Sequence, residues 1–336
     1  MAKKKRISSS KPSAYIANSG SIATMDDGSS AGSDAATSKP AAATAGARSR
    51  APVTIAALPQ EVVRGDWTVV ILALMMFVAP GIGVPNEMML QDTLKSMVVA
   101  FAAVGAGLIF FWQQRNRRDG LRWHALMWLP LALMFYALGS MVWSHTYLGG
   151  VEAIRWFIFS LILWLGINTL SRDRVNYLIE GIHWGAFVAS LWAALQFWVD
   201  FAFFPQGPNP ASTFVNRNFF AEFVVGTIPF SVYLLVQAKG SARITLMAFT
   251  LGFNIVALMM TGTRGALTAL WIFLGLVLPV ILILYRKQFN FYRWDSGKRI
   301  LAVGVLLTSV IGLGIINSGN PKLLADAQAL GSTAFD

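Results

Sequence analysis

The sequence predicts an all-α, polytopic integral membrane protein with about nine transmembrane helices. Of its 336 residues, 55% are hydrophobic and 13% are charged, whereas a soluble domain usually carries about 25% charged residues. Long apolar runs recur along the chain, and each is long enough to cross a bilayer as a helix. Lysine and arginine gather in alternate loops between these runs, which is the distribution that membrane topology requires.

A polar tail precedes the first apolar run. Residues 1–64 are rich in serine, alanine and threonine and begin with the basic cluster Lys3–Arg6. This segment has too little apolar surface to fold alone, so we expect a disordered, basic tail. It also lacks the apolar core of a signal peptide.

Residues 65–317 form the transmembrane domain in this interpretation. Its expected spans share an apolar composition and are separated by short polar loops. They run roughly over Trp67–Gly83, Leu94–Trp112, Trp123–Trp143, Ala153–Leu170, Tyr177–Val199, Phe219–Ala238, Ile244–Met260, Ala266–Tyr285 and Ile300–Ile316.

The basic residues orient these spans. With nine spans, most of the 27 lysines and arginines fall on the side of the N-terminus, which the positive-inside rule places in the cytoplasm. The C-terminus then lies outside. The outer side receives only Lys95, Arg155, Arg217, Arg264 and Lys322. Because the net charge of +11 follows this topology, we expect a membrane as partner and no nucleic acid.

The remaining composition narrows the function classes. The chain has no cysteine, so disulfides and thiol catalysis are excluded. Its histidines lie in separate segments without the spacing of metal ligands, and we expect neither a metal nor a cofactor.

Two of the outer cations are candidates for function. We expect Lys95 to be a solvated interface residue, and Arg155 to form a local ion pair with Glu152, three residues earlier. Arg217 and Arg264 instead lie in polar-flanked positions at membrane depth. A cation there is costly unless it has a partner or faces water.

Arg264 lies at the tip of a predicted helical hairpin. The run Ile244–Met260 ends just before it, and the run Ala266–Tyr285 begins just after it. Gly262 and Gly265 are expected to adopt turn conformations that other residues resist. The two spans therefore change direction at this arginine.

Arg217 lies at the start of the sixth span, after a proline-rich outer loop. Asn216, Arg217 and Asn218 at a helix N-terminus make an anion site, because a guanidinium fork adds to the backbone N–H groups there. Glu222, one turn further, is placed to orient Arg217 or to pair with Arg264. In the alternative interpretation, Asn216 and Asn218 cap the helix and Arg217 anchors it at the interface.

Three other polar residues lie within spans. Glu180 and His183 are three residues apart, and a helix-face pair is the favoured interpretation over a proton relay. Gln196 is placed to hydrogen-bond between helices.

Two motifs carry a resemblance to a known family. Ser212–Phe223 (STFVNRNFFAEF) and Thr261–Leu270 (TGTRGALTAL) resemble segments of the O-antigen ligase and Wzy-type polymerase superfamily. These are polytopic enzymes of bacterial surface-polysaccharide assembly. The likeness runs from about Trp67 to the end of the sequence. The matching positions are Asn216, Arg217, Asn218, Ala221, Arg264 and Gly265.

The resemblance implies a function. Members of the superfamily transfer glycan from a polyprenyl-diphosphate-linked donor to a lipid or glycan acceptor at the outer leaflet of the bacterial inner membrane, without a metal. Their arginines bind the diphosphate leaving group. We therefore expect Arg264 to be the catalytic residue, and the diphosphate or glycan to be bound by Arg217, Asn216, Asn218 and Glu222.

The sequence departs from the superfamily pattern at its end. The resemblance implies a large periplasmic loop with another arginine and a general-base histidine, followed by further spans. Here residues 318–336 are expected to be the truncated start of that loop, so that the chain is a fragment or is completed by another polypeptide. Two alternatives remain: a transporter or flippase for an anionic or lipid-linked solute, and a non-catalytic membrane partner in polysaccharide assembly.

Overall fold

All regular secondary structure is helical in the part of the chain that the computed structural model describes. That part comprises residues 66–85, 91–115, 120–144, 147–204 and 207–321, and no strand occurs in it. Eight helical segments there are long and apolar enough to cross a membrane. These segments agree with the expected polytopic, all-α architecture. The expected tail (1–64) and most of the expected periplasmic segment (318–336) lie outside the described residues.

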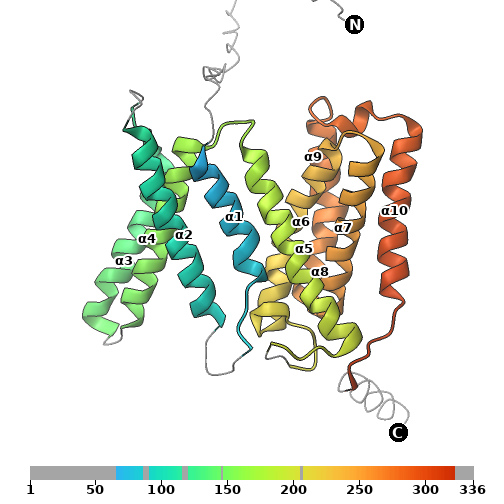
Figure 1. The fold of residues 1–336 in the computed structure, drawn as a ribbon, viewed down its shortest axis with the longest axis horizontal. Coiled ribbons are helices and arrows are strands. Elements are labelled where there is room, and N and C mark those ends of the chain that lie inside the picture. The colour runs from blue at the N-terminus through green and yellow to red at the C-terminus, as the bar shows by residue number, and fades with distance from the viewer. Residues whose placement is uncertain (1–65, 86–90, 116–119, 145–146, 205–206, 322–336) are drawn as a thin grey trace, which may run out of the picture. The chain divides into compact units, whose positions relative to one another are not determined.

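All nine expected spans correspond to helices (Figure 1). The first, α1 (Trp67–Gly81), is shorter than the other eight at 15 residues. At 1.5 Å per residue it extends about 22 Å, less than the roughly 30 Å of a hydrocarbon core. The eight longer segments are α2 (Gln91–Gln114), α3 (Trp128–Ser144) with the 3₁₀ turn η1 (Ala125–Met127), α4 (Leu148–Thr169), α5 (Val175–Val199), α6 (Arg217–Gln237), α7 (Ser241–Met260), α8–η3–α9 (Arg264–Leu284) and α10 (Ser296–Gly314).

The eighth span is one continuous helical segment that changes its winding. The α-helix α8 (Arg264–Ile272) passes into the π-helical η3 (Phe273–Val277) and then into α9 (Leu278–Leu284). Two further 3₁₀ turns lie in loops, η2 (Ser212–Phe214) before α6 and η4 (Asn290–Arg293) before α10.

The main buried cluster joins α5, α6 and α7. Its fully buried members include Ala189 of α5, Phe220 and Ile228 of α6, and Leu258 of α7. These side chains come from three different helices, so the cluster fixes α6 and α7 relative to α5. Arg217 is the first residue of α6, and Arg264 begins the helix that follows α7.

Glycine allows α1 to approach α5 closely. A Cβ atom at Gly181 would lie 2.3 Å from the carbonyl oxygen of Ala73, and one at Gly185 would lie 2.5 Å from that of Met76. Small residues at such crossings let helix backbones pack tightly in membranes. The short helix α1 is therefore held by close backbone contact with α5.

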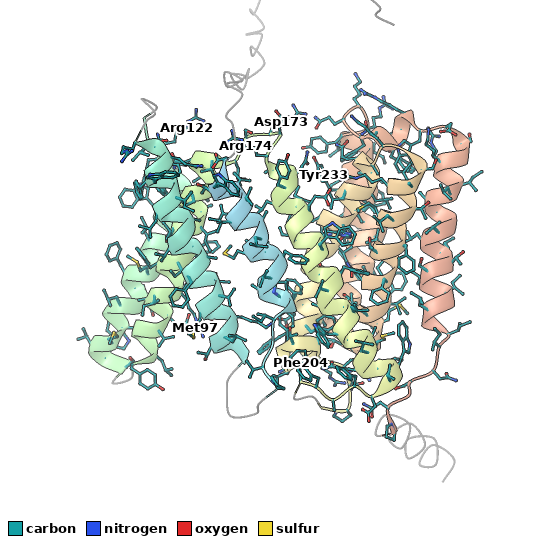
Figure 2. The ribbon with its side chains drawn as sticks, viewed as in Figure 1. Met97, Arg122, Asp173, Arg174, Phe204 and Tyr233 are labelled. Carbon is teal, nitrogen blue, oxygen red and sulfur yellow. The ribbon has the colours of Figure 1, made fainter. Side chains whose placement is uncertain are left out.

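Successive spans run in opposite directions, so the loops between them gather at two ends (Figure 1). Asp173, Arg174 and Tyr233 lie at one end, and Phe204 lies at the other (Figure 2). We call these the Tyr233 end and the Phe204 end. Both α6 and α8 begin at the Phe204 end, whereas α5 and α7 begin at the Tyr233 end (Figure 1).

Candidate functional site

The turn between α7 and α8 is built by Thr261, Gly262 and Thr263. Gly262 has φ of +64°, a left-handed conformation that favours glycine. The Thr261 hydroxyl oxygen accepts a hydrogen bond from the Thr263 N–H at 3.2 Å. The prediction for Gly262 is confirmed, but that for Gly265 is wrong, because Gly265 lies in the first turn of α8 and has no positive φ.

Both predicted arginines are the first residue of a helix. Arg217 opens α6 after the N-cap Asn216, and Arg264 opens α8 after the N-cap Thr263. The Asn216 side chain accepts a hydrogen bond from the Asn218 N–H at 2.8 Å, whereas no side chain caps α8. The backbone N–H groups of the first turn of α8 are therefore left for another acceptor.

A side-chain hydrogen bond joins these two helix starts. The Thr263 hydroxyl donates to Oδ1 of Asn218 at 3.2 Å, and α6 packs against α8 nearby. The two motifs, separated by a whole transmembrane hairpin in the sequence, are neighbours in space. Two helix N-termini, each with partial positive charge, thus point toward one region.

A pocket of about 760 Å³ lies between these helix starts. It brings together four of the five predicted site residues, Arg217, Asn218, Glu222 and Arg264, and Gly265 also lines it. Asn216 does not line the pocket. Its side chain caps α6 instead, as the alternative interpretation of the motif expected.

The charged side chains of the pocket are unpaired within the described part of the chain. Arg217, Arg264 and Glu222 are exposed there, and none of them takes part in the ion pairs formed by the described residues. The expected pairing of Glu222 with either arginine is not formed. The two guanidinium groups outweigh the one carboxylate, so the pocket has a positive character that suits an anion.

The backbone that leads into α6 is strained. Ser212 has φ of +54° and Val215 has φ of +62°, and a non-glycine residue in this region costs on the order of 1–3 kcal/mol. Gln196 of α5 holds the segment. Its Oε1 accepts from the Ser212 N–H at 2.6 Å and from the Ala211 N–H at 3.1 Å, and its Nε2 donates to the Ser212 carbonyl at 3.1 Å. Gln196 therefore bonds to a loop backbone, where interhelical bonding was expected.

Lys95 is a residue whose importance the sequence analysis missed. The expectation of a solvated interface residue is wrong, because Lys95 is half-buried and its ammonium group donates to four oxygens. Carbonyls at a helix C-terminus carry partial negative charge and attract a cation. The acceptors are the carbonyl oxygens of Ala79 (3.2 Å), Pro80 (3.4 Å) and Ile82 (2.8 Å) and the Thr213 hydroxyl (2.8 Å). Lys95 follows the end of α1 closely in the sequence, and this proximity is the signal that could have revealed the contact.

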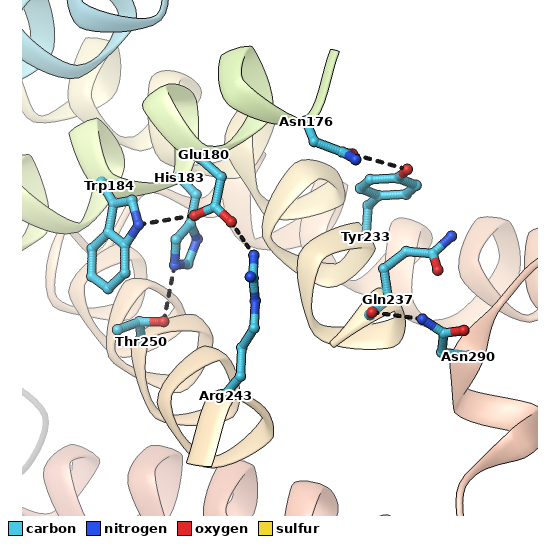
Figure 3. Close-up of polar contacts among 9 residues, drawn as sticks. All are labelled: Asn176, Glu180, His183, Trp184, Tyr233, Gln237, Arg243, Thr250 and Asn290. Atoms are coloured by element: carbon cyan, nitrogen blue, oxygen red, sulfur yellow. Dashed lines mark hydrogen bonds and ion pairs between the residues drawn. The ribbon is translucent and has the colours of Figure 1, made fainter. Parts of the chain in front are cut away.

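The polar cluster at the Tyr233 end differs from its prediction. Glu180 forms an ion pair with Arg243 and accepts a hydrogen bond from the Trp184 indole N–H at 3.0 Å (Figure 3). His183, fully buried, lies 3.0 Å from the Thr250 hydroxyl and 2.8 Å from that of Ser231. The expected Glu180–His183 pair is therefore wrong, because each side chain finds a better partner on another helix.

Two other expectations concern charge and metal ligands. The predicted helix-spaced ion pair is present, with 2.5 Å between Nη1 of Arg155 and Oε1 of Glu152.

Within the described ranges, no three histidine, aspartate or glutamate side chains come together as a metal site requires. Glu222 is the one carboxylate among the described residues that line the pocket.

Comparisons with protein-family models, curated proteins and solved structures find no match for this chain. They identify no family for it, so the resemblance of the two motifs to the O-antigen ligase and Wzy-type polymerase superfamily stays an expectation from the sequence. In the structure, residues of both motifs, Ser212–Phe223 and Thr261–Leu270, line a common pocket.

Proposed function

We propose that this chain acts in the bacterial inner membrane, where it transfers glycan from a polyprenyl-diphosphate carrier to an acceptor at the outer leaflet. The reaction is ligase-like if the acceptor is a lipid and polymerase-like if it is another glycan. One observation carries the proposal: Arg217 and Arg264, each at the start of a helix, line the same pocket without a carboxylate partner among the described residues.

The chemistry of a diphosphate leaving group fits this arrangement. In the transfer, the bond from the anomeric carbon to a phosphate oxygen breaks, and the electron pair of that bond leaves with the diphosphate. The oxygen of the acceptor hydroxyl forms the new bond to the same carbon, and its proton is released to water. Negative charge then grows on the departing diphosphate. Two guanidinium forks and the uncapped first turn of α8 supply donors for this charge. Gly265, without a side chain, leaves that backbone accessible.

The residues have distinct roles in the proposal. Arg264 stabilises the leaving group, and Arg217 binds the same diphosphate from α6. Asn218 is held by Thr263 and Glu222 faces the pocket, so their oxygens and amide suit sugar hydroxyl groups. Asn216 acts indirectly, by fixing the first turn of α6.

The orientation follows from the positive-inside rule. We infer that the Phe204 end faces the periplasm, with the N-terminus in the cytoplasm and the C-terminus in the periplasm. Because the chain has no cysteine, Arg264→Cys gives a single labelling site. It should react with a membrane-impermeant maleimide in intact spheroplasts, while Tyr233→Cys reacts only after permeabilisation. The reverse pattern would refute the orientation.

Deletion of the gene tests the function. The surface polysaccharide should lose its transferred or polymerised glycan on a gel, and the lipid-linked donor should accumulate on the periplasmic leaflet. Wild-type protein and the control Arg155→Ala should restore the pattern, whereas Arg264→Ala at equal expression should not. Accumulation of the donor on the cytoplasmic leaflet would indicate a flippase, and an unchanged polysaccharide would contradict both.

A further inference from the structure

The segment that carries Arg217 into the pocket is held by a cation from another helix. We propose that Lys95 of α2 is a positioning residue for the pocket, because it fixes η2 against the end of α1 and so determines where Arg217 lies. The inference rests on the proposed anion site and adds to it a residue outside both motifs.

The contact is a three-element junction. Thr213 of η2 is fully buried; its hydroxyl accepts from the Lys95 ammonium at 2.8 Å and donates to the Pro80 carbonyl oxygen at 2.6 Å. Lys95 itself also donates to carbonyl oxygens at the end of α1, among them that of Ile82 at 2.8 Å. One ammonium group therefore connects α1, α2 and η2, and neutralises carbonyls that would otherwise carry partial negative charge.

Phe214 transmits this contact to α6. The Lys95 ammonium lies 4.5 Å from the centre of the Phe214 ring, a cation–π distance. The same ring lies 5.2 Å from that of Phe223 and 5.9 Å from that of Phe220, both in the first two turns of α6. Arg217 is in the same turns, so a shift of η2 would move it.

The strained backbone explains why such a contact is needed. Val215, with φ of +62°, lies between Thr213 and Arg217, and β-branched residues rarely adopt this conformation. Such a conformation persists only when its surroundings over-determine it. Gln196 holds η2 from α5, and Lys95 holds it from α2, so removal of either contact would let residues 212–216 relax.

A distance measurement tests the positioning role without reference to any ligand. Spin labels at Phe219→Cys and Thr268→Cys, both exposed, report the separation of the α6 and α8 starts by pulsed electron paramagnetic resonance in the full chain. The distribution should be narrow for the otherwise unchanged protein and should shift or broaden in Lys95→Met and in Thr213→Val. Thr227→Val is the matched control, since its buried hydroxyl donates to the Val224 carbonyl within α6 itself. An unchanged distribution in Thr213→Val would overturn the proposal.

A binding measurement connects the geometry to the pocket. Titration with inorganic pyrophosphate should show an affinity loss of about tenfold for Lys95→Met and for Thr213→Val. The double variant should lose less than the product of the two single losses, because the two residues share one contact. Thr227→Val should bind like wild type. Fully additive losses would overturn the inference. If the spin-label distances change as expected but wild-type protein does not bind pyrophosphate, Lys95 positions the segment and the proposed function fails.

Discussion

Two arginines at the Tyr233 end and two at the Phe204 end are held in different ways. At the Tyr233 end, Arg174 pairs with Asp66 at 2.6 Å and Arg243 pairs with Glu180. At the Phe204 end, Arg217 and Arg264 line a pocket and have no carboxylate partner among the described residues. Arginine side chains therefore occur in two arrangements in this molecule: paired with a carboxylate, or lining a pocket without such a partner among the described residues.

The two pairs of arginines differ in what holds them in place. The Asp66 carboxylate is nearly buried, and a charge in that position is stable only with its partner. Arg217 and Arg264 are instead held by their backbones, at helix starts joined by the Thr263–Asn218 hydrogen bond. An unpaired guanidinium on a fixed backbone is well suited to bind an external anion.

The largest effect should come from the pocket. Arg264→Ala should lower the rate of glycan transfer by about 100-fold or more, as the loss of a preorganised donor to developing charge does. Arg264→Lys should also lose most activity, because an ammonium group lacks the planar fork. Arg243→Ala is the control from the Tyr233 end and should retain transfer. Equal losses in Arg264→Ala and Arg243→Ala would remove the distinction between the two ends.

The next largest effect should be on stability. His183→Leu removes the hydrogen bonds from α5 to Ser231 of α6 and Thr250 of α7, which should lower the free energy of unfolding by about 1–2 kcal/mol. Unfolding in mixed micelles would measure this change. Transfer should persist in the folded fraction. Loss of transfer with unchanged stability would instead favour the proton-relay interpretation of His183.

Glu180→Gln should have a smaller effect. The amide oxygen can still accept from Trp184, so the variant mainly removes the attraction to Arg243, a half-exposed side chain. We expect a loss of about 1 kcal/mol in unfolding free energy and no change in pyrophosphate affinity. A weaker affinity would show that the Tyr233 end influences the pocket.

The smallest effect concerns pH. The hydrogen bond from Lys298 lowers the pKa of Asp295, just before α10. The resulting stabilisation is present above the pKa of the unfolded chain and is lost as the pH falls through the lower pKa of the folded chain. Asp295 is exposed and Lys298 is half-exposed, so Asp295→Asn should change the melting temperature only slightly at neutral pH and not at all in acid. A larger change at low pH would contradict this assignment.

The sequence predicted the helices well because long apolar runs admit little else in a membrane. It also singled out Arg217 and Arg264, since a cation at membrane depth is conspicuous, and the structure brings both to one pocket. It did not predict the contacts of Lys95, Glu180 or His183. Their partners lie on other helices, and helix spacing within one segment carries no information about them.

Arg217 and Arg264 are proposed to bind one anion together in their shared pocket. Titration of the purified full chain with pyrophosphate, in wild type, Arg217→Ala, Arg264→Ala and the double variant, tests this proposal most directly. We expect saturable binding in wild type, a loss of about tenfold or more in each single variant, and a double variant much less affected than the product of the two losses. Unchanged affinity in both single variants would contradict the shared site.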